Sequence, residues 1–575
     1  MAFDLLETKR RARRSAEKGM SPSPWGGRLA IALVYPNTYY NGMSNLGFQY
    51  VHHFLNQREE TLCERFFLPD PQDGALGKGK KNLLVSLESG RPLADFDLVC
   101  FSISFENDYL NLPRIFDLAR LPLFSAERDE RHPLIVCGGV TAFLNPEPLA
   151  DIMDVFAVGE GEVLLPPLID ALLQEGERKV LLKRIAFLPG FYVPRFYRVI
   201  YREDGRVAAC HPLEGVPQRV RRQWVRDLNG SSCRSFLFCR DSEFASMGLM
   251  EISRGCGQGC RFCAAGHIYL PPRERSPQAL AADMEAIRPF RDKFGLVSAA
   301  VSDYSRLPEL VEEMERRGAS FSVSSVRIDS LDRSLLRHLI DCGHRTLTLA
   351  PEAGSARLRN VINKNFDERQ ILDCVMMATA EGIVNIKLYF LIGLPTESEQ
   401  DIEDLNRLVE KIQGVWMEES KKLGRLGNLS LSVNPFIPKP FTPFQWEPMA
   451  PLPLLKERIK AIRLRVGRLP GAEVYFESLR AAQLQAFLAR GDRRVARTLV
   501  PLSRGENLRQ ACREAGLDPD FYIHRPRGKD ELFPWEVIDD GVTRDYLWRE
   551  HEKGLRGETS LPCGTLCRQC GVCSF

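Results

Sequence analysis

The sequence predicts an α/β protein built from two successive units of alternating strands and helices. Within residues 28–169, short apolar runs alternate with helical patterns, which is typical of a doubly wound parallel sheet. From Met250 to about Phe444 the alternation returns over six strands, which predicts an open, partial (βα)6 barrel rather than a closed eightfold one. Helical patterns and a short cysteine-rich stretch follow the barrel.

The chain of 575 residues is too long for one hydrophobic core, so several segments are expected. In order they are an N-terminal extension (1–27), the doubly wound unit (28–169), a β-rich connector (170–245), the barrel (246–450), a helical region (451–555) and a cysteine-rich tail (556–575).

Composition and charge narrow the classes of protein to consider. The net charge of +3 is too small to indicate a nucleic-acid partner. Basic runs at Lys9–Arg14 and Arg219–Arg226 are interpreted as solvated surface in preference to RNA contacts. No apolar run approaches the ~18–20 residues that span a bilayer, and the N-terminus lacks the apolar core of a secretory signal. We therefore expect a cytoplasmic protein without membrane contact.

The doubly wound unit offers loops for a ligand where its strands end. Its predicted strands are Leu29–Tyr35, Asp97–Ser104, Pro133–Val136 and Met153–Val158. Ligands of such sheets bind at the carboxyl ends of the strands, which points to the loops Ser102–Asn107, Cys137–Gly139 and Gly159–Glu162. His52 and His53 fall in the middle of a predicted helix and are expected at its surface.

Three closely spaced cysteines, Cys256, Cys260 and Cys263, follow the first predicted barrel strand. The interleaved glycines let the backbone wrap tightly, so the three thiolates can face one soft metal centre. Three ligands for a four-iron cube leave one iron without a protein ligand. The alternative is that these cysteines form half of a zinc site, although zinc sites usually have four ligands. A disulfide is disfavoured because the chain is expected to be intracellular and three is an odd number of cysteines.

The C-x3-C-x2-C spacing, with Phe262 before the last cysteine, resembles the cluster loop of the radical S-adenosylmethionine (SAM) superfamily. The resemblance implies a 4Fe-4S cluster whose open iron binds the amino and carboxylate groups of SAM. Gly138-Gly139, Asn145–Pro148 and Gly159–Glu162 resemble motifs of an uncharacterised family of radical SAM proteins. Members carry an N-terminal cobalamin-binding-like, flavodoxin-like domain and a C-terminal cysteine cluster. The chain lacks the Asp-x-His-x-x-Gly motif that supplies a histidine to cobalt, so cobalamin binding stays open.

Five further residues are expected to bind SAM at the carboxyl ends of the barrel strands. The strands are predicted at Leu249–Ser253, Leu296–Val301, Phe321–Val326, Thr346–Leu349, Asn385–Ile392 and Asn428–Asn434. The resemblance implies that Asp303 accepts a hydrogen bond from the methionyl amine and Glu352 from the ribose hydroxyls. Arg327 suits a carboxylate, which a guanidinium meets with two parallel hydrogen bonds. Lys387 lies on the fifth strand, and Gly393 begins a run similar to the superfamily's glycine-rich segment near adenine. Singly, such residues are more often helix caps or turns.

The tail contains four more cysteines within eleven residues: Cys563, Cys567, Cys570 and Cys573. Their close spacing favours a second iron–sulfur cluster, because zinc motifs usually separate two cysteine pairs by a dozen or more residues. Zinc and unligated thiols remain the alternatives.

The resemblance implies a radical SAM enzyme. An external one-electron donor of the flavodoxin or ferredoxin type reduces the first cluster, and SAM is cleaved to methionine and a 5′-deoxyadenosyl radical. Methyl transfer is expected if cobalamin binds, and sulfur insertion if the tail holds a second cluster with an open iron, as in the similar methylthiotransferases. Such enzymes often modify tRNA or a ribosomal component.

The alternative function is a non-catalytic iron–sulfur or zinc protein that acts as an RNA-binding or assembly factor. The ordered polar residues at the barrel mouth disfavour it, because a binding module has no need of them. No residue is identifiable from the sequence as a general acid, base or radical carrier.

Overall fold

The first domain is a six-stranded sheet in the order β3-β2-β4-β5-β6-β7. This computed structural model describes residues 2–20, 24–70, 83–324, 326–564 and 567–574. All strands of this sheet are parallel except the last, which pairs antiparallel with β6. Their bounds are β2 Leu29–Thr38, β3 Thr61–Leu68, β4 Leu98–Ser102, β5 Leu134–Gly138, β6 Val155–Ala157 and β7 Phe191–Tyr192. The predicted doubly wound, flavodoxin-like arrangement is confirmed. From β2 the chain first adds β3 on one side and then adds β4 and the later strands on the other, so the strand order switches between β2 and β4.

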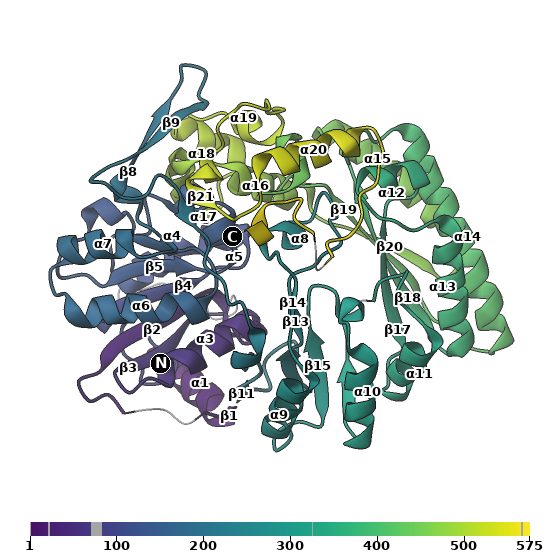
Figure 1. Cartoon of the computed structure of the whole chain (residues 1–575), viewed down its shortest axis with the longest axis horizontal. Coiled ribbons are helices and arrows are strands. Elements are labelled where there is room, and N and C mark those ends of the chain that lie inside the picture. The colour runs from purple at the N-terminus through teal and green to yellow at the C-terminus, as the bar shows by residue number, and fades with distance from the viewer. Residues whose placement is uncertain (1, 21–23, 71–82, 325, 565–566, 575) are drawn as a thin grey trace.

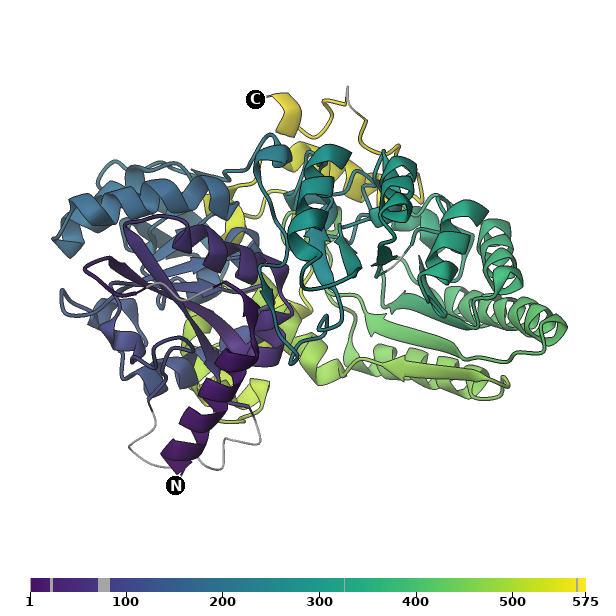
Figure 2. The ribbon, with the colours of Figure 1, turned by 90° about the horizontal axis from the view of Figure 1, so that it is seen from below.

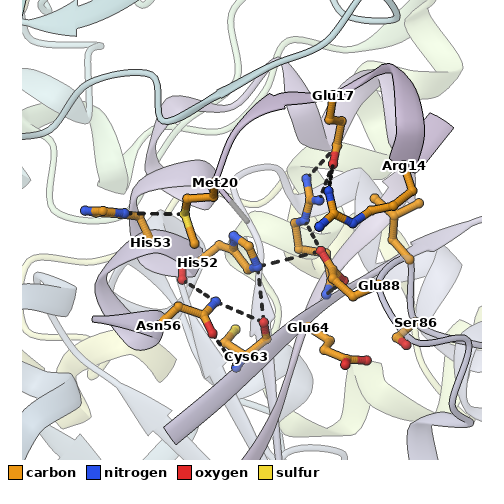
Figure 3. Close-up of polar contacts among 12 residues, drawn as sticks. Arg14, Glu17, Met20, His52, His53, Asn56, Cys63, Glu64, Ser86 and Glu88 are labelled. Atoms are coloured by element: carbon orange, nitrogen blue, oxygen red, sulfur yellow. Dashed lines mark hydrogen bonds and ion pairs between the residues drawn. The ribbon is translucent and has the colours of Figure 1, made fainter. Parts of the chain in front are cut away.

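Strand β3 was missed by the sequence analysis because charged residues interrupt it. Glu64 and Arg65 lie in its centre, yet both side chains are buried. Arg65 forms ion pairs with Glu17 (2.6 Å) and Glu88 (2.7 Å), and Figure 3 labels these two carboxylates. Glu17 directly follows helix α1 (Ala2–Ala16), so the pair fixes this helix to the edge of the sheet.

The expectation that His52 lies at the surface was wrong. His52, on α3 (Leu46–Asn56), is buried, and its Nε2 lies 3.1 Å from the carbonyl oxygen of Cys63 (Figure 3). Burial and the charge of Arg65 hold the pKa of His52 well below its usual value. His53 is half-buried and stacks on Phe236 at 3.4 Å between ring centroids. Both histidines therefore have packing roles, His52 within the first domain and His53 against Phe236 of the connector.

The connector begins with a helix that the sequence analysis did not predict. Helix α6 (Gly161–Gln174) is followed by α7 (Arg178–Phe187), whose Leu181, Leu182 and Ile185 have helical spacing and are buried. Short strands then follow as predicted, including the hairpin of β8 (Tyr197–Tyr201) and β9 (Val207–Pro212).

The second domain is an open arc of parallel strands in two sheets. The first sheet has the order β12-β15-β16, with bounds Gly248–Glu251, Lys293–Val297 and Ser320–Ser322. The second has the order β17-β18-β19-β20, with bounds Thr346–Glu352, Asn385–Ile392, Leu429–Pro435 and Ala472–Phe476. One hydrogen bond, from the N–H of Val326 to the carbonyl oxygen of Thr348 (3.5 Å), bridges them. Ser325, within the third predicted strand, lies outside the described residues.

All six predicted barrel strands are present, and β20 adds a seventh parallel strand. The sequence analysis placed β20 in the helical region because Glu473 and Tyr475 alternate with partly buried residues on this edge strand. Among the helices of that region are α15 (Leu452–Val466), α16 (Leu479–Arg490) and α20 (Arg544–Leu555). No helix in the described ranges is long and apolar enough to cross a membrane.

The C-terminal helices lie across both domains, as Figure 1 shows in yellow, and Figure 2 places the C-terminus opposite helix α1. Asn145 donates from its amide to the carbonyl oxygens of Ala489 (3.0 Å) and Gly491 (2.8 Å). Glu147 pairs with Arg493 at 2.9 Å. These contacts give the Asn145–Pro148 motif a structural role, which is to fix the first domain to the helical region.

Several arginines of the two basic runs bond to other parts of the chain. In the first run, Arg10 and Arg13 pair with Glu7 and Asp70. In the second, Arg219 and Arg222 donate to backbone carbonyl oxygens of the C-terminal region, including those of Glu536 and Asp540. These arginines therefore hold parts of the chain together.

The substitution Gly159→Ala tests how much the close packing of the first domain on the connector contributes to stability. The φ of Gly159 is +133°, and a Cβ there would lie 1.9 Å from the carbonyl oxygen of Gln223. We expect Gly159→Ala to lower the free energy of unfolding by about 2–4 kcal/mol, through backbone strain and overpacking. Gly176→Ala is the control, because no atom lies within 4 Å of the added methyl group. Equal melting temperatures of the two variants would contradict the expectation.

Candidate iron–sulfur and SAM site

The cysteine loop lies between two short paired strands, β13 (Ser253–Arg254) and β14 (Arg273–Glu274). Cys256, Cys260 and Cys263 are all partly exposed free thiols. Gly255 and Gly259 have φ of +92° and +67°, in the region that favours glycine. A Cβ on Gly255 would lie 2.5 Å from the carbonyl oxygen of Tyr269, so the tight path of this loop requires glycine.

Backbone N–H groups near two of the thiols favour the ionised form and so oppose the rise in their pKa. Those of Ala265 and Gly266 act on Cys263, and that of Gln258 acts on Cys256. Burial raises the pKa of all three thiols, that of Cys260 to about 11, whereas these N–H groups and nearby cations lower it. Donors of this kind suit an anionic thiolate-bound cluster.

Across the described residues, no three His, Cys, Asp or Glu side chains converge tightly enough to hold a single metal ion. A four-iron cube is wider than one ion and separates its thiolate ligands further. The three thiols and the glycine-shaped loop suit a four-iron cube, which would be held by Cys256, Cys260 and Cys263.

Two of the expected SAM ligands, Asp303 and Arg327, lie together beside the loop. Their carboxylate and guanidinium are 3.2 Å apart, and Gln258 of the loop donates to Asp303 at 2.8 Å. Arg327 is close enough to Cys256 and Cys260 to lower the pKa of both thiols. The structure thus brings the ends of β15 and β16 to the cysteine loop.

Glu352 completes this group from β17. It sits at a bulge with φ of +64°, and its carboxylate lies 3.9 Å from the ammonium of Lys364. Burial raises the pKa of Glu352, which Lys364 partly opposes. Asn363 donates to the carbonyl oxygens of Gln258 (3.3 Å) and Gly259 (3.2 Å), so this segment is fixed to the loop.

Lys387 and Gly393 are not joined to this group by any contact between described residues. The Lys387 ammonium lies 5.1 Å from the centre of the Tyr389 ring. The N–H of Gly393 donates to both carboxylate oxygens of Glu397 at 3.0 Å, and a Cβ on Gly393 would lie 2.8 Å from Leu455 on α15. Gly393 therefore has a packing reason to be glycine.

A buried charge cluster, missed by the sequence analysis, connects the two domains at the loop. Arg254 contacts Glu160 (2.7 Å), Glu162 (3.0 Å) and Glu251 (2.8 Å), and Arg273 also contacts Glu160 (2.7 Å). Burial opposes ionisation of Glu160, yet the two arginines hold its pKa below the usual value. The only sequence signal was the Gly159–Glu162 motif, which supplies two of these carboxylates.

A cavity of about 560 Å³ lies between the domains beside this cluster. It opens at the carboxyl ends of β4, β5 and β6, where Ser102, Gly138 and Gly159 line it. On the opposite side it is lined by the start of the cysteine loop, including Arg254 and Gly255. The predicted ligand-binding loops of the first domain thus face the predicted cluster.

The C-terminal region holds the loop from its other side. Arg261, fully buried between Cys260 and Cys263, pairs with Glu550 of α20 at 3.0 Å. Ser560 donates from its hydroxyl to Glu550 (2.8 Å) and from its N–H to the side chain of Asn363 (2.8 Å). Neither Glu550 nor Ser560 had a sequence signal, because their partners lie about two to three hundred residues away in the chain.

The tail cysteines come together near the same loop. Burial, together with the nearby thiols of Cys567, Cys570 and Cys573, raises the pKa of Cys563 to about 11. Cys570 is buried and Cys573 is exposed. Thr565, Leu566 and Phe575 of the tail lie outside the described residues.

Glu550→Gln tests whether the C-terminal region stabilises the cysteine loop. The change leaves the buried Arg261 without a counter-charge, which we expect to cost about 3 kcal/mol of local stability. The reconstituted variant should lose iron faster during gel filtration than the unchanged protein. Glu552→Gln, on an exposed position of the same helix, is the control. Equal iron retention in both variants would show that the pair does not support the loop.

Two family models match the chain. Residues 47–194 match the N-terminal domain of radical SAM proteins, and residues 250–409 match the radical SAM superfamily. These two ranges correspond to the doubly wound domain and to the barrel with its cysteine loop.

Individual proteins are also similar to the chain. The uncharacterized protein MJ0966 of Methanocaldococcus jannaschii is 30% identical over 471 residues, which cover 82% of this chain and 90% of that protein. The threonylcarbamoyladenosine tRNA methylthiotransferase MtaB of Aquifex aeolicus is 21% identical, over 67% of this chain and 83% of MtaB. The radical SAM methyltransferase TsrM of Kitasatospora setae aligns with a TM-score of 0.45 and 14% identity, over 70% of this chain and 72% of TsrM. The chain therefore belongs to the radical SAM superfamily, in a family that it shares with MJ0966.

Proposed function

We propose that this radical SAM enzyme transfers a methyl group to an unidentified substrate, with cobalamin bound in the cavity between its domains. The observation that supports the proposal is the position of that cavity. It lies at the strand ends where doubly wound sheets bind ligands, and it borders the loop of Cys256, Cys260 and Cys263. A cofactor held there would be next to SAM on the open iron.

Part of the cavity lining is apolar and flat enough to suit one face of a corrin ring. Gly138, Gly139 and Gly159 carry no side chain at the strand ends, and Val51 and Phe143 are among the apolar residues that line it. No histidine belongs to the described lining, so cobalt would receive no imidazole from it. Bound cobalamin supplies a cobalt centre that accepts and donates methyl groups.

The residues around the loop have separate proposed roles in this reaction. Cys256, Cys260 and Cys263 hold the 4Fe-4S cluster. Arg327 would meet the carboxylate of SAM through parallel hydrogen bonds, for which it must leave Asp303. Asp303 and Glu352 would accept from the amine and the ribose hydroxyls, and Lys387 and Gly393 keep only the expectation drawn from the sequence.

Sulfur insertion is the second candidate, supported by the four tail cysteines beside the loop. MtaB, similar over most of its length, is by name a tRNA methylthiotransferase. A tRNA or ribosomal substrate is therefore proposed for this candidate. The basic runs do not support it, because several of their arginines are paired within the chain.

Cobalamin binding decides between the two candidates. We expect the anaerobically reconstituted protein to retain one equivalent of hydroxocobalamin through gel filtration, seen in its absorption spectrum. Val51→Trp should abolish retention by filling the cavity. Val163→Trp, at an exposed position of α6 that does not line the cavity, should not. Absence of binding by the unchanged protein would overturn methyl transfer through cobalamin.

SAM cleavage separates an enzyme from a non-catalytic iron–sulfur or zinc factor. The reduced protein should produce methionine and 5′-deoxyadenosine, and the variant with alanine at Cys256, Cys260 and Cys263 should produce neither. Cleavage that survives in this variant would refute the assignment of the cluster ligands.

Glu352→Ala tests the proposed SAM contacts. Losing a buried hydrogen bond to a charged group costs about 1.5–3 kcal/mol, so the dissociation constant of SAM should rise roughly ten- to a hundredfold. Asp303→Ala should act similarly, and Glu399→Ala, at an exposed position, is the control. An unchanged dissociation constant in Glu352→Ala would leave this carboxylate only a structural role.

A further inference from the structure

The tail docks directly on the backbone of the cysteine loop. The N–H of Cys563 donates to the carbonyl oxygen of Gly257 at 2.6 Å, and Gly257 is the neighbour of Cys256. A Cβ on Gly257 would lie 3.3 Å from the Cβ of Cys563. The first tail cysteine is therefore in van der Waals contact with the loop that holds the first cluster.

The other end of the tail is fixed to the start of helix α20. The N–H of Thr543 donates to the carbonyl oxygen of Cys570 at 2.8 Å, and a Cβ on Gly571 would lie 2.6 Å from the side chain of Thr543. Helix α20 itself is tied to the loop through Glu550 and Arg261. The two attachments fix the tail at Cys563 and at Cys570, beside the loop of Cys256, Cys260 and Cys263.

The tail lies outside the cavity between the domains. The described lining of that cavity ends at Ala299 and includes no residue of the C-terminal region. A centre in the tail would therefore lie outside this cavity. Cys573 and Arg568 are exposed, so one side of the tail remains accessible to another protein.

We infer that the four tail cysteines hold an iron–sulfur centre through which the electron enters. A ferredoxin or flavodoxin gives up one electron, the tail centre takes it up, and the cluster at Cys256, Cys260 and Cys263 receives it. The tail centre then returns to its oxidised state, and no bond is formed or broken. The positive charge of Arg568, between Cys567 and Cys570, suits an acidic redox protein.

This inference rests on the radical SAM chemistry of the proposed function, because that chemistry requires a reduced first cluster. It differs from the sulfur-insertion candidate, in which the tail centre would supply sulfur or hold substrate. A tail that supplies sulfur would leave reduction of the first cluster unchanged when its cysteines are replaced.

The test compares two reductants without SAM or cobalamin present. The variant with serine at Cys563, Cys567, Cys570 and Cys573 is reconstituted, and its iron is counted. Freeze-quench paramagnetic resonance then measures how fast the first cluster is reduced. We expect dithionite to reduce it as fast as in the unchanged protein, and reduced flavodoxin to act at least tenfold more slowly. Cys210→Ser, at a thiol in the β8–β9 hairpin, is the control and should behave as the unchanged protein.

A second variant covers the case in which the serine substitutions also remove the first cluster. Arg568→Glu keeps every cysteine and should slow reduction by flavodoxin, with the largest effect at low salt. The inference would be overturned if flavodoxin reduced the first cluster of either variant as fast as that of the unchanged protein, provided the variant retains this cluster. Zinc in place of iron in the tail would also overturn it. Failure of the proposed function would appear differently, as normal reduction of the first cluster without SAM cleavage or cobalamin binding.

Discussion

The mostly buried arginine Arg254 determines how the two domains meet. A guanidinium removed from water must be matched by carboxylates, and Glu160, Glu162 and Glu251 match it from both domains. Because Arg254 precedes Gly255 and Cys256 directly, any rotation of the doubly wound domain would pull on the cysteine loop. The cavity exists where it does because this cluster fixes the strand ends of one domain against the loop of the other.

Three distant parts of the chain converge on this one loop. The first domain reaches it through Glu160 and Glu162, and the barrel reaches it through Asp303 and Asn363. The C-terminal region reaches it through Glu550. Three thiols on a glycine-rich loop would otherwise have much conformational freedom. The surrounding contacts restrict that freedom before any cluster binds, which lowers the entropic cost of holding one.

Features set by local sequence were predictable, whereas those set by distant partners were not. Apolar runs located most of the strands, and cysteine spacing located the loop. Strand β3 was missed because its buried Glu64 and Arg65 look like surface residues until Glu17 and Glu88 are seen beside Arg65. His52 was expected at the surface for the same reason, because its partner, the carbonyl oxygen of Cys63 on β3, is not apparent from the sequence. Asp303, Arg327 and Glu352 were expected at the carboxyl ends of barrel strands, and the structure places them near the loop because the ends of parallel strands meet at one edge. Lys387 and Gly393 were expected by the same rule but have no hydrogen bond or ion pair to this group among the described residues. Their roles, like those of the other three, stay predictions.

The pairing of Arg261 with Glu550 has a consequence for how the protein is made. The two residues are 289 positions apart. At ribosomal speeds of about 5–20 residues per second, Glu550 is synthesised roughly 15–60 s after Arg261. During that interval the growing chain carries the three thiols on a loop that lacks its C-terminal support. Iron delivered in this interval would meet an unfinished site, so maturation of the first cluster belongs after translation has passed α20.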